Sequence, residues 1–368
     1  MRVLMVSKAC LVGAYQSKLE EIARRDEVEL MVVTPPDWRG VEGVTRLERA
    51  HTQGYELIVE PIAFNGRFHL HFYPRLARRI RAFRPDVVHV DEEPYNLATA
   101  HAIALARQAG CRTLWFTWQN LLRRYPPPFS LFERYCLRRA DAAIAGSHTA
   151  ARVWREKGYG GPLAVIPQFG VDPQVFAPSD RRASGREMVV GFAGRLVKEK
   201  GVDVLLDAVA GLPGVRVEIL ALGSEGLREQ LAAQAEQLGI AGRVVFHSAL
   251  PSTRMPEFYA RLDALVLPSR SQPNWAEQFG RVLIEAMACG TPVVGSTCGE
   301  IPHVIGDAGL VFAEGDAQAL RAQLTRLLGD SELRADLARR GREHVLAHYT
   351  QAQVAEQTVA FYRAMMTR

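Results

Sequence analysis

Two glutamates in the second half of the 368-residue chain have the type and spacing to bind a sugar joined to a diphosphate. Glu277 and Glu285 lie in the segment EQFGRVLIEAMACG (277–290), which is typical of a buried helix that begins near Gly280. The first backbone N–H groups of a helix have no partner within it and attract anions such as phosphate. Carboxylates on either side of that phosphate could accept hydrogen bonds from sugar hydroxyls. The spacing is suited to a ligand made of a sugar, a diphosphate and a nucleoside.

An ordinary structural role is the alternative for both glutamates, because charged residues are mostly exposed. Glu277 would then be a solvated loop residue and Glu285 a partly exposed helix position. However, Glu285 stands in VLIEAMAC, where every neighbour is apolar or small. A carboxylate buried in such surroundings needs hydrogen-bond partners, which favours the binding role.

A pair of cations follows the first apolar strand of the same half, in the stretch GFAGRLVKEKGVDVLLDA. Gly194 permits close approach of the backbone, and Arg195 and Lys200 precede a helix predicted over residues 202–210. Arginine grips phosphate oxygens through a planar fork, and lysine acts as a mobile point charge. Either cation alone is typical of a solvated surface, but the two together favour a phosphate site.

Short apolar runs of strand length alternate with helical segments along the chain, which predicts parallel sheets covered on both faces by helices. The predicted strands are 2–7, 29–34, 86–90, 113–118 and 142–146, then 188–194, 215–223, 243–248, 263–269 and 291–296. Helical segments in the first half include 17–25, 96–108 and 129–140. The predicted fold class is α/β, with two doubly wound Rossmann-like domains facing a central cleft. In such sheets, ligands bind at the loops that follow the strands.

The chain is too long for a single core, and a break rich in proline, glycine, serine and charge at 170–187 is typical of a linker. We therefore predict one domain over 1–172 and a second over 173–349. A helix over about 350–368 is expected to cross back to the first domain.

The composition is that of a globular protein, with 48% hydrophobic and 23% charged residues. No apolar run reaches the roughly 18 to 20 residues that span a bilayer, and Lys8 interrupts the N-terminal apolar stretch. The five cysteines form no CxxC pair, so we expect reduced thiols, no zinc site and a cytoplasmic location. The net charge of +5 suits an anionic partner, but no basic block interleaved with aromatic residues indicates a nucleic acid.

Taken together, GRLVKEKG and EQFGRVLIEAMACGTPVVGS resemble the retaining glycosyltransferases of family 4, whose signature is two glutamates separated by seven residues. The resemblance covers nearly the whole chain and implies the GT-B fold. It further implies transfer of a hexose from a nucleotide-diphosphate sugar to a hydroxyl acceptor such as a glycan, lipid or small molecule. A UDP-sugar is favoured as donor, and a GDP-sugar is the second option. The first domain would bind the acceptor and the second the sugar nucleotide.

The resemblance also implies roles for individual residues. Arg195 and Lys200 would hold the diphosphate. Glu285 would bind the ribose and Glu277 the transferred sugar, so that Arg195, Lys200 and Glu277 act in catalysis. The other implied donor-binding positions are Gly13, Gly194, Gly223, Phe279, Gly280, Val282 and Leu283. The segment 247–259 would hold the base.

The family is thought to react by front-face attack without a protein nucleophile, so the main task is to stabilise charge on the leaving diphosphate. Protein cations and a helix N-terminus can do this, and no DxD motif follows a strand. No metal and no cofactor are therefore expected.

The acceptor side departs from the family pattern. Many relatives carry a histidine after a strand of the first domain, whereas FTWQNLLRRYPPPF has Gln119 and Asn120 and no histidine. Either amide could hydrogen-bond the sugar there, and both are expected in the acceptor site. Glu92 and Glu93, in VDEEPYN, are further acceptor candidates, with a solvated loop as the equal alternative.

Two weaker patterns have ordinary explanations. His69 and His71 in FHLHFY could bind a metal, but no carboxylate or cysteine lies near them in the sequence, so packed histidines are favoured. The arginine-rich segment PRLARRIRAFRPD is more typical of a packed helix with a solvated face than of a membrane-surface helix. A peripheral contact of this basic surface with the inner membrane face stays open as an alternative.

Two other functions also stay open. Some sugar-nucleotide 2-epimerases share the GT-B fold. A non-catalytic sugar-nucleotide-binding subunit is the third class, although Arg195, Lys200, Glu277 and Glu285 argue against it.

Overall fold

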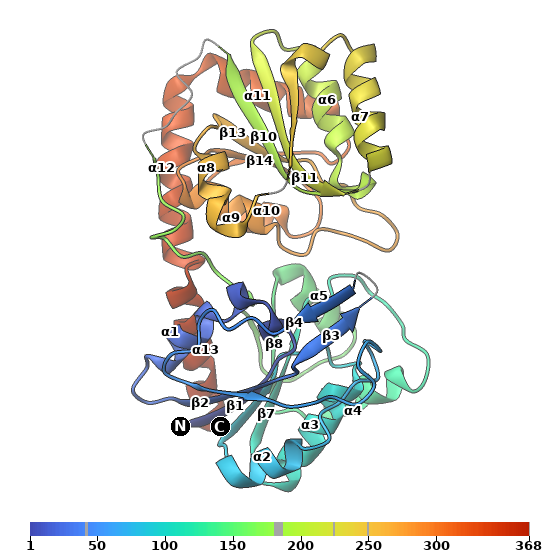
Figure 1. Cartoon of the computed structure of the whole chain (residues 1–368), viewed down its shortest axis with the longest axis vertical. Helices are drawn as coiled ribbons and strands as arrows, with labels where there is room; N and C mark the ends of the chain where they lie inside the picture. The colour runs from blue at the N-terminus through green and yellow to red at the C-terminus, as the bar shows by residue number, and fades with distance from the viewer. Residues whose placement is uncertain (41–42, 180–186, 224, 249, 368) are drawn as a thin grey trace. The chain divides into compact units, whose positions relative to one another are not determined.

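The computed structural model describes all residues except 41–42, 180–186, 224, 249 and 368, and it contains two compact units (Figure 1). The first consists of Met1–Gly170 together with Gln351–Arg368, and the second of Val171–Thr350. Residues 180–186 of the predicted linker lie outside the described part of the chain.

The first unit is built on a parallel sheet with the strand order β5-β2-β1-β6-β7-β8-β9. Its strands are β1 (Arg2–Val6), β2 (Glu29–Thr34), β5 (Glu56–Val59), β6 (Val87–Val90), β7 (Arg112–Thr117), β8 (Ala142–Ala145) and β9 (Leu163–Val165). Its helices are α1 (Ser17–Ala23), α2 (Leu76–Phe83), α3 (Leu97–Gln108), α4 (Phe129–Arg139), α5 (His148–Glu156) and α13 (Gln351–Met366). A hairpin of β3 (Asp37–Gly40) and β4 (Gly43–Arg46) follows β2.

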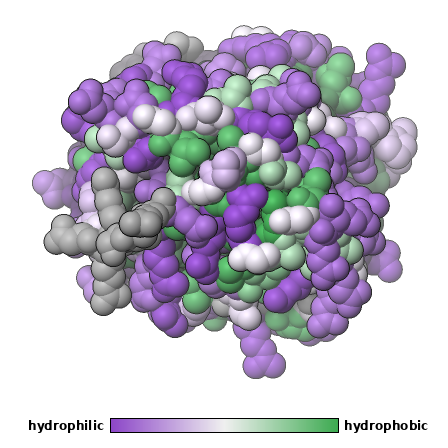
Figure 2. All heavy atoms as spheres, turned by 90° about the horizontal axis from the view of Figure 1, so that it is seen from above, coloured by the Kyte–Doolittle hydropathy of each residue, from purple (hydrophilic) through white to green (hydrophobic). Residues whose placement is uncertain are grey.

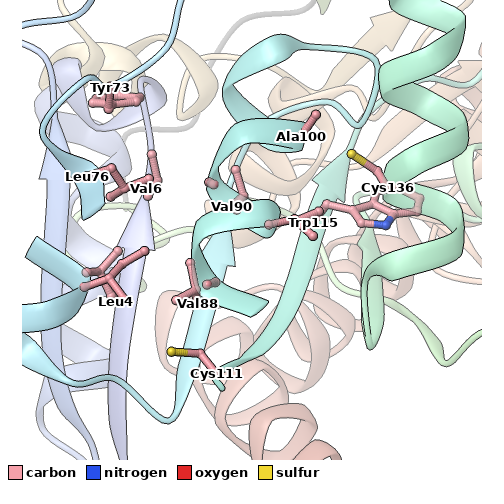
Figure 3. Packing of buried hydrophobic residues seen from close by; sticks show 14 of the residues in the cluster. Leu4, Val6, Tyr73, Leu76, Val88, Val90, Ala100, Cys111, Trp115 and Cys136 are labelled. Atoms are coloured by element: carbon pink, nitrogen blue, oxygen red, sulfur yellow. The ribbon is translucent and has the colours of Figure 1, made fainter. Parts of the chain in front are cut away.

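Both faces of this sheet are buried, which explains why its strands are apolar without alternation. Leu4 and Val6 of β1 pack in one cluster with residues of α2, α3 and α4, as Figure 3 shows. Val3 and Met5 point to the opposite face, where α1 and α13 cover them. Successive residues of a strand point to opposite faces, so one apolar run serves both cores.

Helix α2 buries its apolar stripe in the first of these clusters. Leu76, Ile80 and Phe83 are all buried there. The packed-helix interpretation of the arginine-rich segment is thereby confirmed, and the stripe is not available for insertion into a membrane.

The last helix, α13, belongs to the first unit and packs on α1. The Tyr362 hydroxyl forms a 2.6 Å hydrogen bond with Nδ1 of His89 on β6. An ion pair of 2.9 Å between Arg25 and Glu356 adds to this packing at the surface.

The second unit has a parallel sheet with the strand order β12-β11-β10-β13-β14-β15. Its strands are β10 (Met188–Leu196), β11 (Val215–Gly223), β12 (Val244–His247), β13 (Ala264–Leu267), β14 (Val293–Ser296) and β15 (Leu310–Phe312). Its helices are α6 (Val202–Ala210), α7 (Glu225–Gln237), α8 (Met255–Tyr259), α9 (Arg281–Ala288), α10 (Ile301–Ile305), α11 (Ala317–Gly329) and α12 (Ser331–His348). The prediction of two doubly wound α/β domains is confirmed.

Each sheet has one point at which the order of its strands reverses. In the first unit the chain moves from β1 outward through β2 to β5 and then returns to β6, beside β1. In the second unit it moves from β10 through β11 to β12 and returns to β13, beside β10. The loops after the two strands at such a reversal separate and leave a crevice, where open α/β sheets bind their ligands. The two reversal points are β1/β6 and β10/β13.

The surface carries mixed polarity on the face shown in Figure 2, where hydrophobic residues lie among hydrophilic ones without forming one continuous area. Within the described part of the chain, no helix has both the length and the apolar character needed to cross a membrane.

Candidate active site

A lysine and a glutamate meet at the β10/β13 reversal point of the second unit. Lys200 ends a short 3-10 helix (Lys198–Lys200) after β10, and its Nζ lies 2.5 Å from Oε2 of Glu277. Ser269, in the loop after β13, donates a 3.0 Å hydrogen bond to the same oxygen. Glu277 is only 8% exposed, so the solvated-loop alternative for it is wrong. The indole of Trp275 stands beside this pair, 5.3 Å from the Lys200 Nζ.

Two glycines allow the loops around this pair to approach closely. Gly201 has φ +68°, and a Cβ there would lie 2.0 Å from the Pro268 carbonyl oxygen. Gly299 has φ +58°, and a Cβ there would lie 2.1 Å from the Glu277 carbonyl oxygen. Any other residue would push these loops apart, so the chain conformation at both glycines fixes the position of the lysine–glutamate pair.

Glu285 lies inside α9 and is buried. Tyr259 donates a 2.6 Å hydrogen bond to one carboxylate oxygen, and the Nε of Arg281 lies 2.9 Å from the other. Burial raises the pKa of Glu285, and the charge of Arg281 with the Tyr259 hydroxyl opposes this shift. The alternative of a partly exposed helix position is therefore wrong. Its neighbours already satisfy the carboxylate in part, which lets it remain in an apolar helix.

Helix α9 begins where the sequence predicts it. Gly280 is its N-cap, with φ +87°, and Arg281 is its first residue. The backbone N–H groups at this end were expected to have no partner within the helix. For Leu283 this is wrong, because its N–H donates a 2.8 Å hydrogen bond to the Gly280 carbonyl. Phe279 is buried, with its ring 5.6 Å from that of Tyr349, so its side chain serves the core. Val282 is partly buried.

Strand β10 continues further than predicted, through Leu196, and carries the exposed Arg195 at its carboxyl end. Arg195 pairs in the ladder with Leu222, and Leu196 pairs with Gly223, the last residue of β11. A Cβ at Gly223 would lie 2.5 Å from the Leu196 carbonyl oxygen, so this glycine permits the pairing. Gly194 is partly buried at the same edge.

Parts of the predicted nucleotide pocket lie outside the described residues. These are Ser224, in the loop after β11, and Ala249, in the predicted base-binding segment. A cavity of about 260 Å³ lies near the 3-10 helix of Lys200. Lys198, Asp203, Gln230 and Arg270 are among the residues that line it. It does not include Arg195, Lys200 or Glu277.

In the first unit, the N–H of Gly13 is already bonded. It donates a 2.7 Å hydrogen bond to Oε2 of Glu48. Gln16 fixes the same loops together, since its side-chain amide donates to the Glu48 carbonyl and accepts from the Ala50 N–H. In this structure the Gly13 amide is thus taken by a carboxylate of the chain itself, contrary to the expectation that it approaches a phosphate.

The two acceptor candidates after β6 are both held inside the first unit. Glu92 is buried, with its carboxylate 3.9 Å from the Lys8 Nζ and 3.5 Å from Nε2 of His71. Glu93 is partly buried and accepts from the Thr117 hydroxyl at 2.6 Å and from the backbone N–H of Trp118 at 2.8 Å. A solvated loop is therefore the wrong description of either glutamate.

Burial is also the main cause of the pKa shift of Glu93. It raises the pKa of this carboxyl to about 7, against the hydrogen bonds from Thr117 and Trp118, which lower it. Of the two amides after β7, Gln119 is buried and donates a 2.9 Å hydrogen bond to the Leu121 carbonyl. Asn120 is partly buried.

Among the described residues, no group of three or more histidine, cysteine, aspartate or glutamate side chains has an arrangement that could hold a metal ion. His69 and His71 diverge to different partners. His69 bonds to the side chain of Asn96 at 2.9 Å, and Nδ1 of His71 lies 2.8 Å from the Phe68 carbonyl.

Two family models match consecutive parts of the chain. The model described as Glycosyltransferase Family 4 matches residues 19–175, and the one described as Glycosyl transferases group 1 matches residues 177–344. The chain belongs to glycosyltransferase family 4.

Curated relatives agree with this family. A D-inositol 3-phosphate glycosyltransferase of Mycobacterium marinum is 30% identical over 342 residues, which are 87% of this chain and 66% of that protein. Another of the same name, from Segniliparus rotundus, is 34% identical over 219 residues, 55% of this chain and 47% of that protein. The chain thus spans about half to two thirds of the length of these relatives.

Solved structures show the same fold at low identity. Sucrose-phosphate synthase from Thermosynechococcus elongatus aligns with a TM-score of 0.73 at 19% identity, covering 100% of this chain and 99% of that one. HepE from Anabaena, solved in complex with UDP, aligns with a TM-score of 0.72 at 19% identity, covering 99% of this chain and 100% of that one. The fold of this family 4 member is GT-B.

The second unit of this family 4 chain brings Lys200, Glu277 and the start of α9 to one reversal point, as the motif spacing predicts. In the first unit, Lys8 and His71 both lie next to Glu92, and the Trp38 ring contacts Lys8 and His71. The sequence pattern points to His71 only as a metal ligand and does not indicate Lys8 or Trp38. The one sequence signal for Lys8 is its position directly after the first predicted strand.

Proposed function

We propose that this protein is a retaining glycosyltransferase that transfers a hexose from a UDP-sugar to a hydroxyl-bearing acceptor. The observation that carries the proposal is the Lys200–Glu277 pair at the β10/β13 reversal point, with the exposed Arg195 on the same edge of the sheet. The family supports glycosyl transfer, and the UDP complex of HepE supports a uridine donor. The name of the curated relatives supports a small polyol among the acceptors.

In this proposal Lys200 changes partner when the donor binds. Without ligand, Glu277 neutralises the ammonium at 2.5 Å. With a donor, the leaving diphosphate accepts from Lys200 and Arg195, while Glu277 accepts from the hydroxyls of the transferred sugar. The protein cations then stabilise the negative charge that develops as the glycosidic bond breaks. The hydroxyl proton of the acceptor leaves with the diphosphate, and no protein nucleophile is required.

Glu285 is proposed to bind the ribose. Glu285 lies in the second turn of α9, and Tyr259 and Arg281 orient its carboxylate. The N-terminus of α9 would face the phosphate between the two glutamates. No metal ion is needed for this arrangement, and chelators should leave turnover intact.

A thermal-shift panel tests the donor assignment. A ligand that binds only the folded state raises the melting temperature, so UDP and UDP-glucose should raise it more than GDP, ADP or uridine. Lys200→Ala should abolish the shift. Lys198→Ala is the matched control, because Lys198 is an exposed lysine of the same short helix. If only GDP raises the melting temperature, the donor is a GDP-sugar and the uridine assignment is wrong. If no nucleotide raises it, the proposed function is contradicted.

The 2-epimerase alternative is tested with the donor alone. Incubation of UDP-N-acetylglucosamine with the protein would give its 2-epimer if the chain were an epimerase. A transferase should instead release UDP slowly, by transfer to water.

A further inference from the structure

Lys8 and Glu92 occupy the reversal point of the first unit. Lys8 lies in the loop after β1 (Arg2–Val6), and Glu92 lies in the loop after β6 (Val87–Val90). These two strands are the neighbours between which the strand order reverses. The crevice of a doubly wound sheet forms at this place, so ligand-binding side chains are expected there.

His71 joins them from the segment after β5, and one hydrogen bond orients its ring. Nδ1 lies 2.8 Å from the Phe68 carbonyl oxygen, which can only accept, so Nδ1 carries a proton. The other ring nitrogen, Nε2, lies 3.5 Å from Oε1 of Glu92. This distance is too long for a good hydrogen bond, so neither atom satisfies the other.

Three polar atoms at this place are buried without a hydrogen-bond partner among the described residues. They are Nζ of Lys8, Nε2 of His71 and Oε1 of Glu92. The side chain of His71 is fully buried, and that of Glu92 is 5% exposed. Burying such groups unpaired costs free energy, and a folded protein rarely leaves three together. A group that both donates and accepts hydrogen bonds would satisfy them.

Aromatic rings lie next to the Lys8 ammonium. The Lys8 Nζ lies 4.2 Å from the centre of the Trp38 ring and 4.0 Å from that of Phe68, and the Trp38 ring also contacts His71. Phe68 is 45% exposed, so it is the ring next to solvent. Flat apolar rings beside hydrogen-bonding groups suit the C–H faces and hydroxyls of a saturated ring.

The charges at this place favour a hydroxyl over a phosphate. Lys8 carries the cation and Glu92 the carboxylate, so the pair is balanced. A phosphate between them would meet the carboxylate at close range. A hydroxyl has one proton and two lone pairs, so it can accept from Lys8 and donate to the Glu92 carboxylate beside His71.

We propose that Lys8, His71 and Glu92 bind a hydroxyl of an uncharged polyol ring, a sugar or a cyclitol, which serves as the acceptor. The ring lies against Trp38 and takes the place of the Phe68 side chain. The role of the ring as acceptor rests on the proposed transferase function. Its binding to these residues does not depend on the donor.

Fluorescence titration of the whole protein tests the binding directly. Myo-inositol and D-glucose are the uncharged probes, and D-inositol 3-phosphate is the phosphorylated one. Tryptophan emission should change in a saturable manner with an uncharged probe, and Trp38→Phe should remove most of the change. The phosphorylated ring should bind at least about tenfold more weakly.

Two variants test the named side chains. Glu92→Gln and Lys8→Met should each weaken binding of the uncharged probe by about tenfold, the loss typical of one hydrogen bond to a charged group. Lys8→Met keeps a side chain of similar length between the two rings, so it guards against misfolding. UDP affinity should remain within twofold in both variants, which shows that they are folded.

Three results would overturn the inference: no saturable change with either uncharged probe, tighter binding of the phosphorylated ring, or unchanged affinity in both variants. UDP binding by the wild-type protein is measured in the same series. If UDP fails to bind while an uncharged probe binds, the proposed transferase function fails and the polyol site remains.

Discussion

Each unit of this chain places a lysine and a glutamate at the reversal point of its sheet, but the two pairs are built differently. In the second unit Lys200 and Glu277 are in contact at 2.5 Å, and Ser269 adds a hydrogen bond. In the first unit Lys8 and Glu92 are 3.9 Å apart, and polar atoms of both lack hydrogen-bond partners in the described structure. The shared topology thus places a lysine and a glutamate at equivalent positions in the two units, while the neighbouring residues decide what each pair can bind.

The neighbours differ in charge and in polarity. Strand β10, which precedes Lys200, carries the exposed Arg195 near its end, and the chain after β13 leads to the N-terminus of α9. Both features favour an anion. Beside Lys8 lie the rings of Trp38 and Phe68, which favour an uncharged ring. The comparison supports the proposals that the second unit binds phosphate and that the first binds a polyol.

The largest effect is expected at Lys200. Lys200→Ala should lower turnover by roughly 10²- to 10³-fold, because it removes one preorganised charge that stabilises the leaving diphosphate. Arg195→Ala should act similarly. Steady-state kinetics with a UDP-sugar checks both, with Lys198→Ala as control. If Lys200→Ala turned over at the wild-type rate, the proposal that this reversal point binds the diphosphate would be contradicted.

The two glutamates of the second unit should separate in binding. Glu285→Gln should weaken UDP by about tenfold, since a hydrogen bond to a charged group contributes roughly 1.5–3 kcal/mol. Glu277→Gln should leave UDP affinity nearly unchanged and yet lower turnover strongly, because Glu277 is assigned to the sugar. Isothermal titration with UDP, alongside donor kinetics, distinguishes them. Equal weakening of UDP by both variants would contradict the division of roles.

Stability should depend on pH through Glu93 of the first unit. Its pKa is raised to about 7 in the folded protein, so the folded state holds a proton that the unfolded state has lost. The free energy of unfolding should therefore fall as pH rises from about 4.5 to 7, by about 3 kcal/mol. Urea unfolding at several pH values measures this.

Glu93→Gln should flatten that pH profile. Glu56→Gln, at an exposed position of β5, is the control and should follow the wild type. The same slope in Glu93→Gln as in the wild type would assign the dependence to other groups.

The last predicted effect concerns the glycine after the first strand. A Cβ at Gly13 would lie 2.6 Å from the Cβ of Ala50, so Gly13→Ala should destabilise the fold by about 1–3 kcal/mol. At Gly160 an added Cβ meets no atom within 4 Å, and Gly160→Ala should be near neutral. Thermal unfolding compares the two. Equal stability would show that the loops around Gly13 yield freely.

Local pattern was enough to predict the sheets and the start of α9. The strands 29–34 and 215–223 and the helix 202–210 were predicted with the bounds that the structure shows, because their apolar periods are long. The apolar pattern does not predict β3, β4, β5, β9 and β15, and the three-residue strands β9 and β15 are too short to show one. Strand β10 runs past its predicted end because Arg195 and Leu196 still pair with β11.

Contacts between distant residues were beyond the pattern. The sequence offered Lys200 and Glu277 as members of one site, but their direct ion pair joins residues 77 positions apart. Glu92 reaches His71, which seemed to have no carboxylate near it, only because the loops after β5 and β6 converge. The hydrogen bond from the Gly13 amide to the Glu48 carboxylate is another contact between residues distant in the sequence. Such contacts form because the tertiary fold brings these loops together, and no local sequence pattern predicts them.

A crystal structure with bound UDP is the most direct test of whether the β10/β13 reversal point binds the diphosphate of a sugar nucleotide. We expect phosphate oxygens within hydrogen-bond distance of the Lys200 Nζ and ribose hydroxyls on the Glu285 carboxylate. The contrary result is UDP in the cavity lined by Lys198, Asp203, Gln230 and Arg270, with the Lys200–Glu277 pair still in contact.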